Sequence, residues 1–185
     1  MRTFVAVDLS EEIRQSLFAV AENVRQLRLD GRPTRLDGLH LTLKFLGEIA
    51  EDRVEQIRCS LEEVYHDLCA FQVQVEGVGV FPHLARPRVL WVGIRRSEEL
   101  KELQGRVEAG LEALGFSREG RDFTPHLTLM RLKSTNGLDR LAGFVRENSK
   151  IELGVLEVTA FHLYQSILRP DGAQYQKLLT FELPA

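Results

Sequence analysis

The sequence predicts an α+β protein built from two similar lobes. Three observations support this prediction: segments with helical spacing alternate with β-branched and aromatic runs, the order of elements occurs twice, and no Ser-, Gly- or Pro-rich linker divides the 185 residues. We therefore expect one unit over 1–185, with lobe-forming repeats at about 1–84 and 85–165. A C-terminal hairpin strand is expected at 173–183.

Four segments have apolar residues at the three- and four-residue intervals of a helix. Ser10 and Ser97 are suitable N-caps for the first and third, and each is followed by two glutamates, which the helix dipole favours in a first turn. The apolar positions run through 13–27, 54–68, 100–114 and 138–145.

Runs rich in β-branched and aromatic residues predict the strands. Pro170, Asp171 and Gly172 predict the turn of a C-terminal hairpin, which either borders the cleft or is purely structural. The predicted strands are 3–7, 39–46, 71–80, 89–94, 126–132, 151–164 and 175–183.

A tetrapeptide, His-Leu-Thr-Leu, occurs at 40–43 and again at 126–129. The two copies are 86 residues apart, and the two helix starts at Ser10 and Ser97 are 87 residues apart. Because the two offsets agree within one residue, accidental recurrence is a poor explanation. We expect each lobe to be built around one copy of this tetrapeptide.

Composition excludes several classes of protein. The chain has 24 Lys and Arg against 27 Asp and Glu, so it lacks the basic excess that non-specific nucleic-acid binding requires. No segment reads as a signal peptide or spanning helix, which predicts a cytoplasmic protein. Cys59 and Cys69 are too few for structural zinc, and we expect both to be reduced and buried.

Alternation along a strand places His40, Thr42 and Lys44 on one face and Leu41, Leu43 and Phe45 on the other. The same alternation puts His126 beside Thr128, opposite Leu127 and Leu129. Each strand thus offers an apolar face to its lobe and a polar face to a shared cleft.

Two imidazoles and two hydroxyls around one substrate suit phosphoryl chemistry. Histidines with ordinary pKa values near 6.5 can hold complementary protonation states, so one acts as base and one as acid. Threonine hydroxyls can donate hydrogen bonds to non-bridging phosphoryl oxygens. A strained phosphodiester such as a nucleoside 2′,3′-cyclic phosphate fits this arrangement without a metal.

At these residues the chain resembles the two-histidine phosphoesterase superfamily, and within it the RNA 2′,3′-cyclic phosphodiesterases, also called 2′-5′ RNA ligase-like proteins. The resemblance rests on RTFVAVDLSEEIR, GLHLTLKFLGEI, FPHLARPRVLWVGI, RDFTPHLTLMRL and SILRPDGAQYQKLLTFEL. It implies two pseudo-symmetric lobes of mainly antiparallel sheet with helices packed outside and a central cleft.

The resemblance also implies a reaction: metal-independent hydrolysis of RNA 2′,3′-cyclic phosphate ends to 2′-phosphate ends, without a cofactor, by a monomer. It leaves 2′-5′ RNA ligation open. It implies that His40 donates a proton to the departing 3′ oxygen and that His126 accepts one from the attacking water. Thr42, Thr128 and Arg131 match phosphate-binding positions of the family, although the alternation puts Arg131 opposite His126, so that Arg131 needs a bulge or a long reach to touch phosphate.

One departure concerns the approach to the first motif. Where family members often carry an aromatic residue, this chain has the non-aromatic stretch 32–38, so Arg32 or Arg35 is a candidate for contacting the RNA backbone instead. Lys44 either reaches phosphate or is solvated, and Trp91 is expected in the core. The histidines without a neighbouring motif, His66, His83 and His162, are expected at structural or surface positions. Four arginines either help to hold an RNA end or simply face solvent: Arg86, Arg88, Arg95 and Arg96.

Two other functions remain open at the level of sequence. A metal enzyme could use His40 and His126 as ligands, but neither motif brings a neighbouring carboxylate or cysteine. A non-catalytic RNA-end binding module could share the scaffold, but binding alone does not need two titrating groups.

Overall fold

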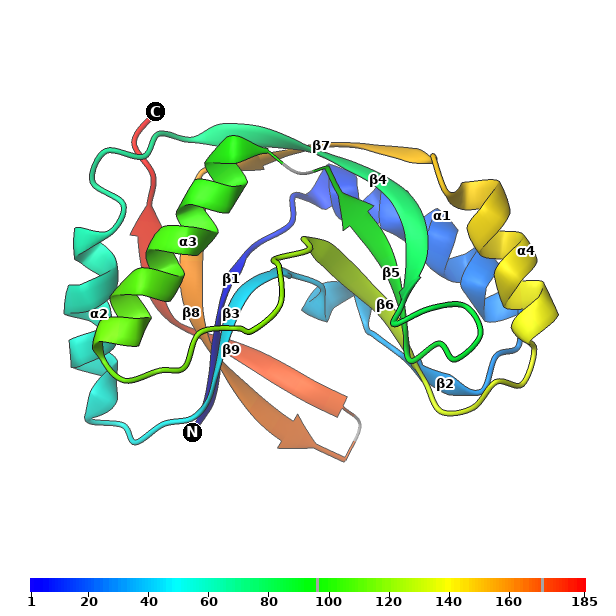
Figure 1. Cartoon of the computed structure of the whole chain (residues 1–185), viewed down its shortest axis with the longest axis horizontal. Helices are drawn as coiled ribbons and strands as arrows, with labels where there is room; N and C mark the ends of the chain where they lie inside the picture. Colours follow the sequence, from blue (N-terminus) through cyan, green and yellow to red (C-terminus); the bar gives the residue numbers. More distant parts are fainter. Residues whose placement is uncertain (96, 171) are drawn as a thin grey trace.

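The structure of the chain, a computed structural model, describes residues 1–95, 97–170 and 172–185. In this part of the chain, the strands form two antiparallel sheets that face each other in Figure 1. The four-stranded sheet has the order β3-β1-β8-β9, with β1 (Arg2–Val7), β3 (Leu41–Glu48), β8 (Ala160–Arg169) and β9 (Gly172–Glu182). The five-stranded sheet has the order β2-β6-β5-β4-β7, with β2 (Gly31–Pro33), β4 (Phe71–Phe81), β5 (Val89–Ile94), β6 (His126–Leu132) and β7 (Glu152–Val158).

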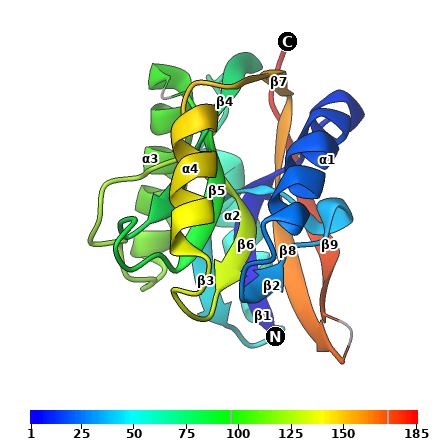
Figure 2. The same ribbon diagram turned by 90° about the vertical axis from the view of Figure 1, so that its right-hand side faces the viewer.

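Helices cover the outer face of each sheet, as Figures 1 and 2 show. Helix α1 packs against β7 and α4 against β4, while α3 packs against β3 and α2 lies between α3 and β9. The helices are α1 (Glu11–Gln26), α2 (Arg53–Glu63), α3 (Glu98–Ala113) and α4 (Leu138–Asn148). The predicted α+β fold of two lobes, with mainly antiparallel sheets and helices outside, is confirmed.

The two sheets do not follow the two sequence repeats. Strand β1 lies in the four-stranded sheet, yet the helix that follows it, α1, covers the five-stranded sheet; β5 and α3 show the reverse exchange. Strand β4 from the first half also joins the sheet of β5 and β6. Each lobe therefore contains elements of both halves, and β3 contacts β6 although they belong to different sheets.

The helix caps agree with the sequence prediction. Ser10 Oγ accepts from the backbone N–H of Ile13 at 3.3 Å, and Ser97 Oγ accepts from Leu100 at 3.0 Å. Helix α2 ends at Glu63, earlier than the predicted Leu68. The apolar spacing continues past the end of the helix, because Leu68 is buried from the turn that follows.

The predicted strand 151–164 is two strands. Strand β7 pairs with β4 in one sheet and β8 pairs with β1 in the other, with the change of partner at Thr159. Composition is β-favouring throughout this run, so it carries no signal of where a strand changes sheets. The short edge strand β2 was not predicted. Of the expected turn 170–172, Asp171 lies outside the described residues, as does Arg96.

Fully buried leucines hold both motif strands to the core. Leu41 and Leu127, each directly after a motif histidine, have no exposed surface. Cys59 and Cys69 are exposed free thiols, so the prediction that they are buried is wrong. The apolar spacing of α2 is satisfied by Ile57 and Leu61 and leaves Cys59 outside the core. No helix in the described ranges is long and apolar enough to cross a membrane.

Candidate active site

His40 stands at the entrance to β3, directly after a turn of 3-10 helix at Leu36–Gly38. Its Nδ1 lies 2.8 Å from the carbonyl oxygen of Gly38. Because a carbonyl can only accept, the ring must donate through Nδ1–H. The neutral imidazole therefore keeps its lone pair on Nε2, on the side of the ring away from the backbone.

His126 repeats this arrangement on the other sheet. It is the first residue of β6, and its Nδ1 lies 2.8 Å from the carbonyl oxygen of Thr124. In both motifs the acceptor is the carbonyl two residues earlier in the chain. The same tautomer is thus fixed twice, so both rings are available for proton transfer through Nε2.

A β-bulge follows each motif threonine. Along β1 and β3 the pairing moves from Ala6↔Thr42 to Val5↔Lys44, so one extra residue is inserted in β3. Phe45 then pairs with Phe4 and returns to the face of Thr42. The predicted alternation beyond Thr42 is therefore wrong: Lys44 lies on the face opposite Thr42, and Phe45 lies on the face of Thr42 with 53% of its surface exposed.

The second motif has the same bulge. Trp91 pairs with Thr128, but the next pair is Leu90↔Met130, which brings Val89 opposite Arg131. Because Val89 and Trp91 share one face of β5, Arg131 lies on the face of Thr128. Of the two ways in which Arg131 could touch phosphate, a bulge or a long reach, the bulge is present, and Arg131 occupies in β6 the position that Phe45 occupies in β3.

Lys44 is part of the core rather than the cleft. Its side chain is 1% exposed, and Nζ lies 2.7 Å from Glu108 Oε2 of α3 and 2.7 Å from the carbonyl oxygen of Ser117. The expectation that Lys44 either reaches phosphate or is solvated is wrong on both counts, because the bulge directs it toward α3. Lys44 instead connects the first motif strand to the segment that leads into the second.

Aromatic rings enclose His40. Its ring stacks on Phe4, with centroids 4.5 Å apart and planes inclined by 25°, and Tyr175 meets it edge-on at 5.0 Å. Tyr164 lies 6.3 Å from it in a stacked orientation. Among the described residues, His126 has one such neighbour, Phe81, edge-on at 4.9 Å. The two half-sites, by which we mean the surroundings of each motif histidine, therefore differ. An aromatic enclosure surrounds His40, and a more open setting surrounds His126.

Sequence reasoning missed Phe4, Tyr164 and Tyr175 as neighbours of the first histidine. Tyr164 and Tyr175 belong to the C-terminal hairpin of β8 and β9, which has no counterpart in the repeat. The hairpin thus borders the site. Trp91 was expected in the core but is half-buried, and its pairing with Thr128 places it on the motif face of β5.

The electrostatics of the two histidines follow from these surroundings. Burial lowers the pKa of His40 to about 4; the hydrogen bond to Gly38 and the charge of Asp8 oppose this shift, and Arg14 adds to it. Burial also lowers the pKa of His126, opposed by the hydrogen bond to Thr124 and assisted by Arg131. Each histidine therefore has one arginine within electrostatic reach and is neutral at pH 7 in the free protein.

A polar cluster lies beside the aromatic enclosure. Lys177 Nζ donates to Asp8 Oδ2 at 2.8 Å, and the Tyr164 hydroxyl donates to Oδ1. Burial raises the pKa of Asp8, but these two hydrogen bonds, together with the charges of His162 and Lys177, lower it by more, so the carboxylate stays ionised. His162, 5% exposed, is hydrogen-bonded to Thr180 at 3.1 Å, in agreement with a structural role.

The remaining predicted residues lie elsewhere. His66 and His83 are exposed, as are Arg86 and Arg88. Arg95 is paired with Glu76, with Nη2 and Oε2 2.5 Å apart. In the described part of the chain, no three or more of His, Cys, Asp and Glu form a group able to hold a metal ion.

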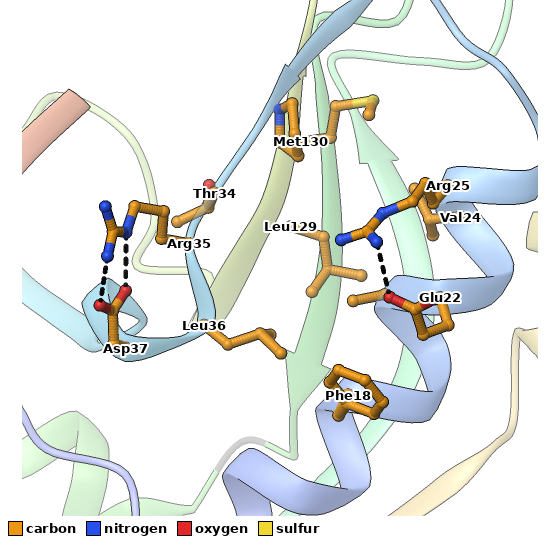
Figure 3. Close-up of a pocket in the computed structure, with 12 residues that line it drawn as sticks. Phe18, Glu22, Val24, Arg25, Thr34, Arg35, Leu36, Asp37, Leu129 and Met130 are labelled. Carbon is orange, nitrogen blue, oxygen red and sulfur yellow. Dashed lines mark hydrogen bonds and ion pairs between the residues drawn. The ribbon is translucent and has the colours of Figure 1, made fainter. Parts of the chain in front are cut away.

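A separate pocket of about 430 Å³ lies between α1, residues 33–37 and β6. Figure 3 shows Phe18 of α1 and Leu36 beside it, with the Arg35–Asp37 and Glu22–Arg25 ion pairs nearby. Neither motif histidine lines this pocket. Its wall includes Leu129 and Met130 of the bulge, whose side chains leave the cleft face, so the pocket lies behind the second motif rather than within the site.

Comparison with known proteins places the chain in a family. A profile of the 2′-5′ RNA ligase superfamily matches residues 4–167. The chain is 38% identical over 182 residues to an RNA 2′,3′-cyclic phosphodiesterase of Archaeoglobus fulgidus, with 98% of this chain and 100% of that protein covered. It is 31% identical over 183 residues to one of Methanothermobacter thermautotrophicus, with 99% of each covered.

Comparison with solved structures supports the same family. A protein of Thermus thermophilus, 30% identical, superposes with a TM-score of 0.82 and covers 99% of this chain and 98% of its own. Escherichia coli LigT in complex with 3′-AMP, 27% identical, superposes with a TM-score of 0.79 and covers 98% and 97%. The chain therefore belongs to the 2′-5′ RNA ligase superfamily.

Proposed function

We propose that the protein hydrolyses RNA 2′,3′-cyclic phosphate ends to 2′-phosphate ends by histidine acid–base catalysis without a metal. The observation that carries the proposal is that His40 and His126 are held in the same tautomer. Both Nδ1 atoms donate to backbone carbonyls at 2.8 Å, so both Nε2 atoms are left for proton transfer. The names of the relatives support this substrate, since they are RNA 2′,3′-cyclic phosphodiesterases.

The proposed reaction is an in-line displacement at phosphorus. Water attacks as His126 Nε2 takes its proton, and the bond from phosphorus to the 3′ oxygen breaks as His40 Nε2 delivers a proton to that oxygen. The products are a 2′-phosphate and a 3′-hydroxyl. Thr42 and Thr128 donate hydrogen bonds to the non-bridging oxygens, and Arg131, on the face of Thr128, stabilises their negative charge.

Because the pKa of His40 is low in the free protein, the bound substrate must help to protonate this histidine. A neutral His40 cannot act as an acid, and its pKa is about 4 in the free protein. An anionic phosphate bound beside Nε2 favours the imidazolium and raises this pKa. His126, also neutral before binding, is already in the form that a base requires.

The aromatic half-site suits the base of the terminal nucleoside. Phe45 lies on the cleft face of β3 with 53% of its surface exposed, and it supplies the stacking surface that the non-aromatic stretch 32–38 lacks. One chain provides both histidines, so we propose that the monomer is active, which gel filtration of the active protein tests.

The decisive experiment offers an oligoribonucleotide ending in a 2′,3′-cyclic phosphate, with excess chelator, and identifies the product. We expect a 2′-phosphate. A 3′-phosphate would show that the 2′ oxygen departs, and loss of activity in chelator that added metal restores would show a metal enzyme. A second RNA with a 5′-hydroxyl tests ligation in the same assay, because its attack in place of water would form a 2′-5′ linkage.

A further inference from the structure

Two arginines stand opposite each other at the edge of the five-stranded sheet. Arg32 of β2 pairs with Arg131 of β6 in the antiparallel register. Directly opposed residues in such a pair project from the same face, with Cβ atoms about 4.5–5.5 Å apart. Both side chains are exposed, and neither has an ion-pair partner among the described residues.

The face they share is the face of the second motif. Arg131 lies on the face of Thr128 because of the bulge at Leu129. The neighbours of Arg32 point the other way: a Cβ on Gly31 would meet Met130 Sδ at 3.0 Å, and Pro33 lines the pocket behind β6. Arg32 therefore projects beside Arg131, next to the proposed position of the reacting phosphate.

This pairing carries an electrostatic cost. Like charges directly opposite in a sheet are destabilising. Some other exposed arginines have carboxylate partners, as Arg95 has in Glu76 and Arg106 has in Asp67. Two unpartnered guanidinium groups on the face of the motif threonine are arranged to receive an anion.

The proposed substrate contains a second anion. A terminal nucleoside with a 2′,3′-cyclic phosphate is joined to the rest of the RNA through its 5′ phosphodiester, which a mononucleotide lacks. Building on the function proposed above, we propose that Arg32 binds this 5′ phosphodiester while Arg131 contacts the cyclic phosphate. The protein therefore prefers oligoribonucleotide ends to nucleoside 2′,3′-cyclic phosphates.

Charged side chains also protect edge strands against pairing with other chains, and β2 is an edge strand. The two roles differ in what they predict. A protective charge affects aggregation and is indifferent to the length of the substrate. A phosphodiester contact raises kcat/KM for the dinucleotide more than for the mononucleotide, and its effect depends on the charge of the linkage.

The test compares adenosine 2′,3′-cyclic phosphate with the dinucleotide adenylyl-adenosine 2′,3′-cyclic phosphate. We expect Arg32→Gln to lower kcat/KM for the dinucleotide about tenfold more than for the mononucleotide. Replacing the phosphodiester of the dinucleotide by an uncharged methylphosphonate should lower kcat/KM of the wild type by the same factor. The same replacement should not lower kcat/KM of the variant any further. The salt dependence of kcat/KM for the dinucleotide should be weaker in the variant than in the wild type.

Arg146→Gln, an equal charge change on α4, is the matched control and should leave kcat/KM unchanged for both substrates. Equal effects of Arg32→Gln on both substrates would overturn the contact. If the wild type hydrolyses neither substrate, the proposed function fails instead. Binding of adenylyl-adenosine 2′-phosphate and adenosine 2′-phosphate then decides the contact: a loss confined to the dinucleotide supports it, and an equal loss or none overturns it.

Discussion

Lys44 of β3 and Glu108 of α3 form a buried ion pair, with Nζ and Oε2 2.7 Å apart and side chains 1% and 8% exposed. Lys44 also donates to the carbonyl oxygen of Ser117, on the segment that runs from α3 to the second motif. One side chain thus links the strand of His40 to the approach of His126. The link is part of the core and contacts no substrate.

The first prediction follows from this burial. Lys44→Met should lower the free energy of unfolding by about 3–5 kcal/mol, because it leaves the Glu108 carboxylate buried without its partner. Denaturant unfolding monitored by circular dichroism measures the change. The double variant Lys44→Met/Glu108→Leu should recover most of the loss, since it removes the orphaned charge. A single-variant loss below about 1 kcal/mol would show that water reaches the pair.

The second prediction concerns the two imidazoles. His40→Asn and His126→Asn should each lower kcat on a 2′,3′-cyclic phosphate end by about 10²- to 10⁴-fold, the usual contribution of one general acid or base. Neither should change the fold, because each ring makes one hydrogen bond to a backbone carbonyl and lies at the cleft. His83→Asn, at an exposed position, is the matched control. Turnover within tenfold of wild type in either motif variant contradicts the mechanism.

The third prediction is the pH dependence of catalysis. The mechanism needs a protonated His40 and a neutral His126, and both pKa values lie below 6.5 in the free protein, that of His40 at about 4. The profile of kcat/KM reports the free enzyme, so it should peak below pH 6.5. The profile of kcat should reach its maximum at a higher pH than that of kcat/KM, because the bound phosphate raises the pKa of His40. Two limbs of kcat/KM above pH 7 would be incompatible with this electrostatic picture.

Much of the site follows from sequence, because the motif residues act through local geometry. Alternation along a strand places a histidine beside a threonine, and in both motifs the carbonyl that fixes the histidine tautomer is only two residues away. The repeat spacing then indicates that two such units exist. These inferences depend on separations of a few residues and on one internal comparison.

What sequence could not supply depends on contacts between distant segments. The bulges that turn Lys44 inward and Phe45 outward are set by the pairing with β1, and no residue of HLTLKF marks them. Tyr175 reaches His40 from the far end of the chain, and Arg32 gains meaning only once β2 pairs with β6. The change of sheet at Thr159 is of the same kind.

The fourth prediction is the pH dependence of stability. Because burial lowers the folded-state pKa of His40 to about 4, the folded protein binds fewer protons than the unfolded chain between pH 6.5 and 4. Stability therefore rises with pH in this window, and acidification from pH 6.5 to 4 should cost about 3 kcal/mol through His40. His126 contributes in the same direction. Carboxylates with lowered pKa values, such as Asp8, add to the loss of stability once the pH falls below about 5.

His40→Asn isolates that contribution. The variant retains a side chain able to donate to the Gly38 carbonyl but does not titrate, so its free energy of unfolding should change less between pH 6.5 and 5 than that of the wild type. Urea denaturation at half-unit pH steps, with His83→Asn as the control, measures the difference. If the two slopes coincide, water solvates the imidazole within the aromatic enclosure, and the substrate is not needed to protonate His40.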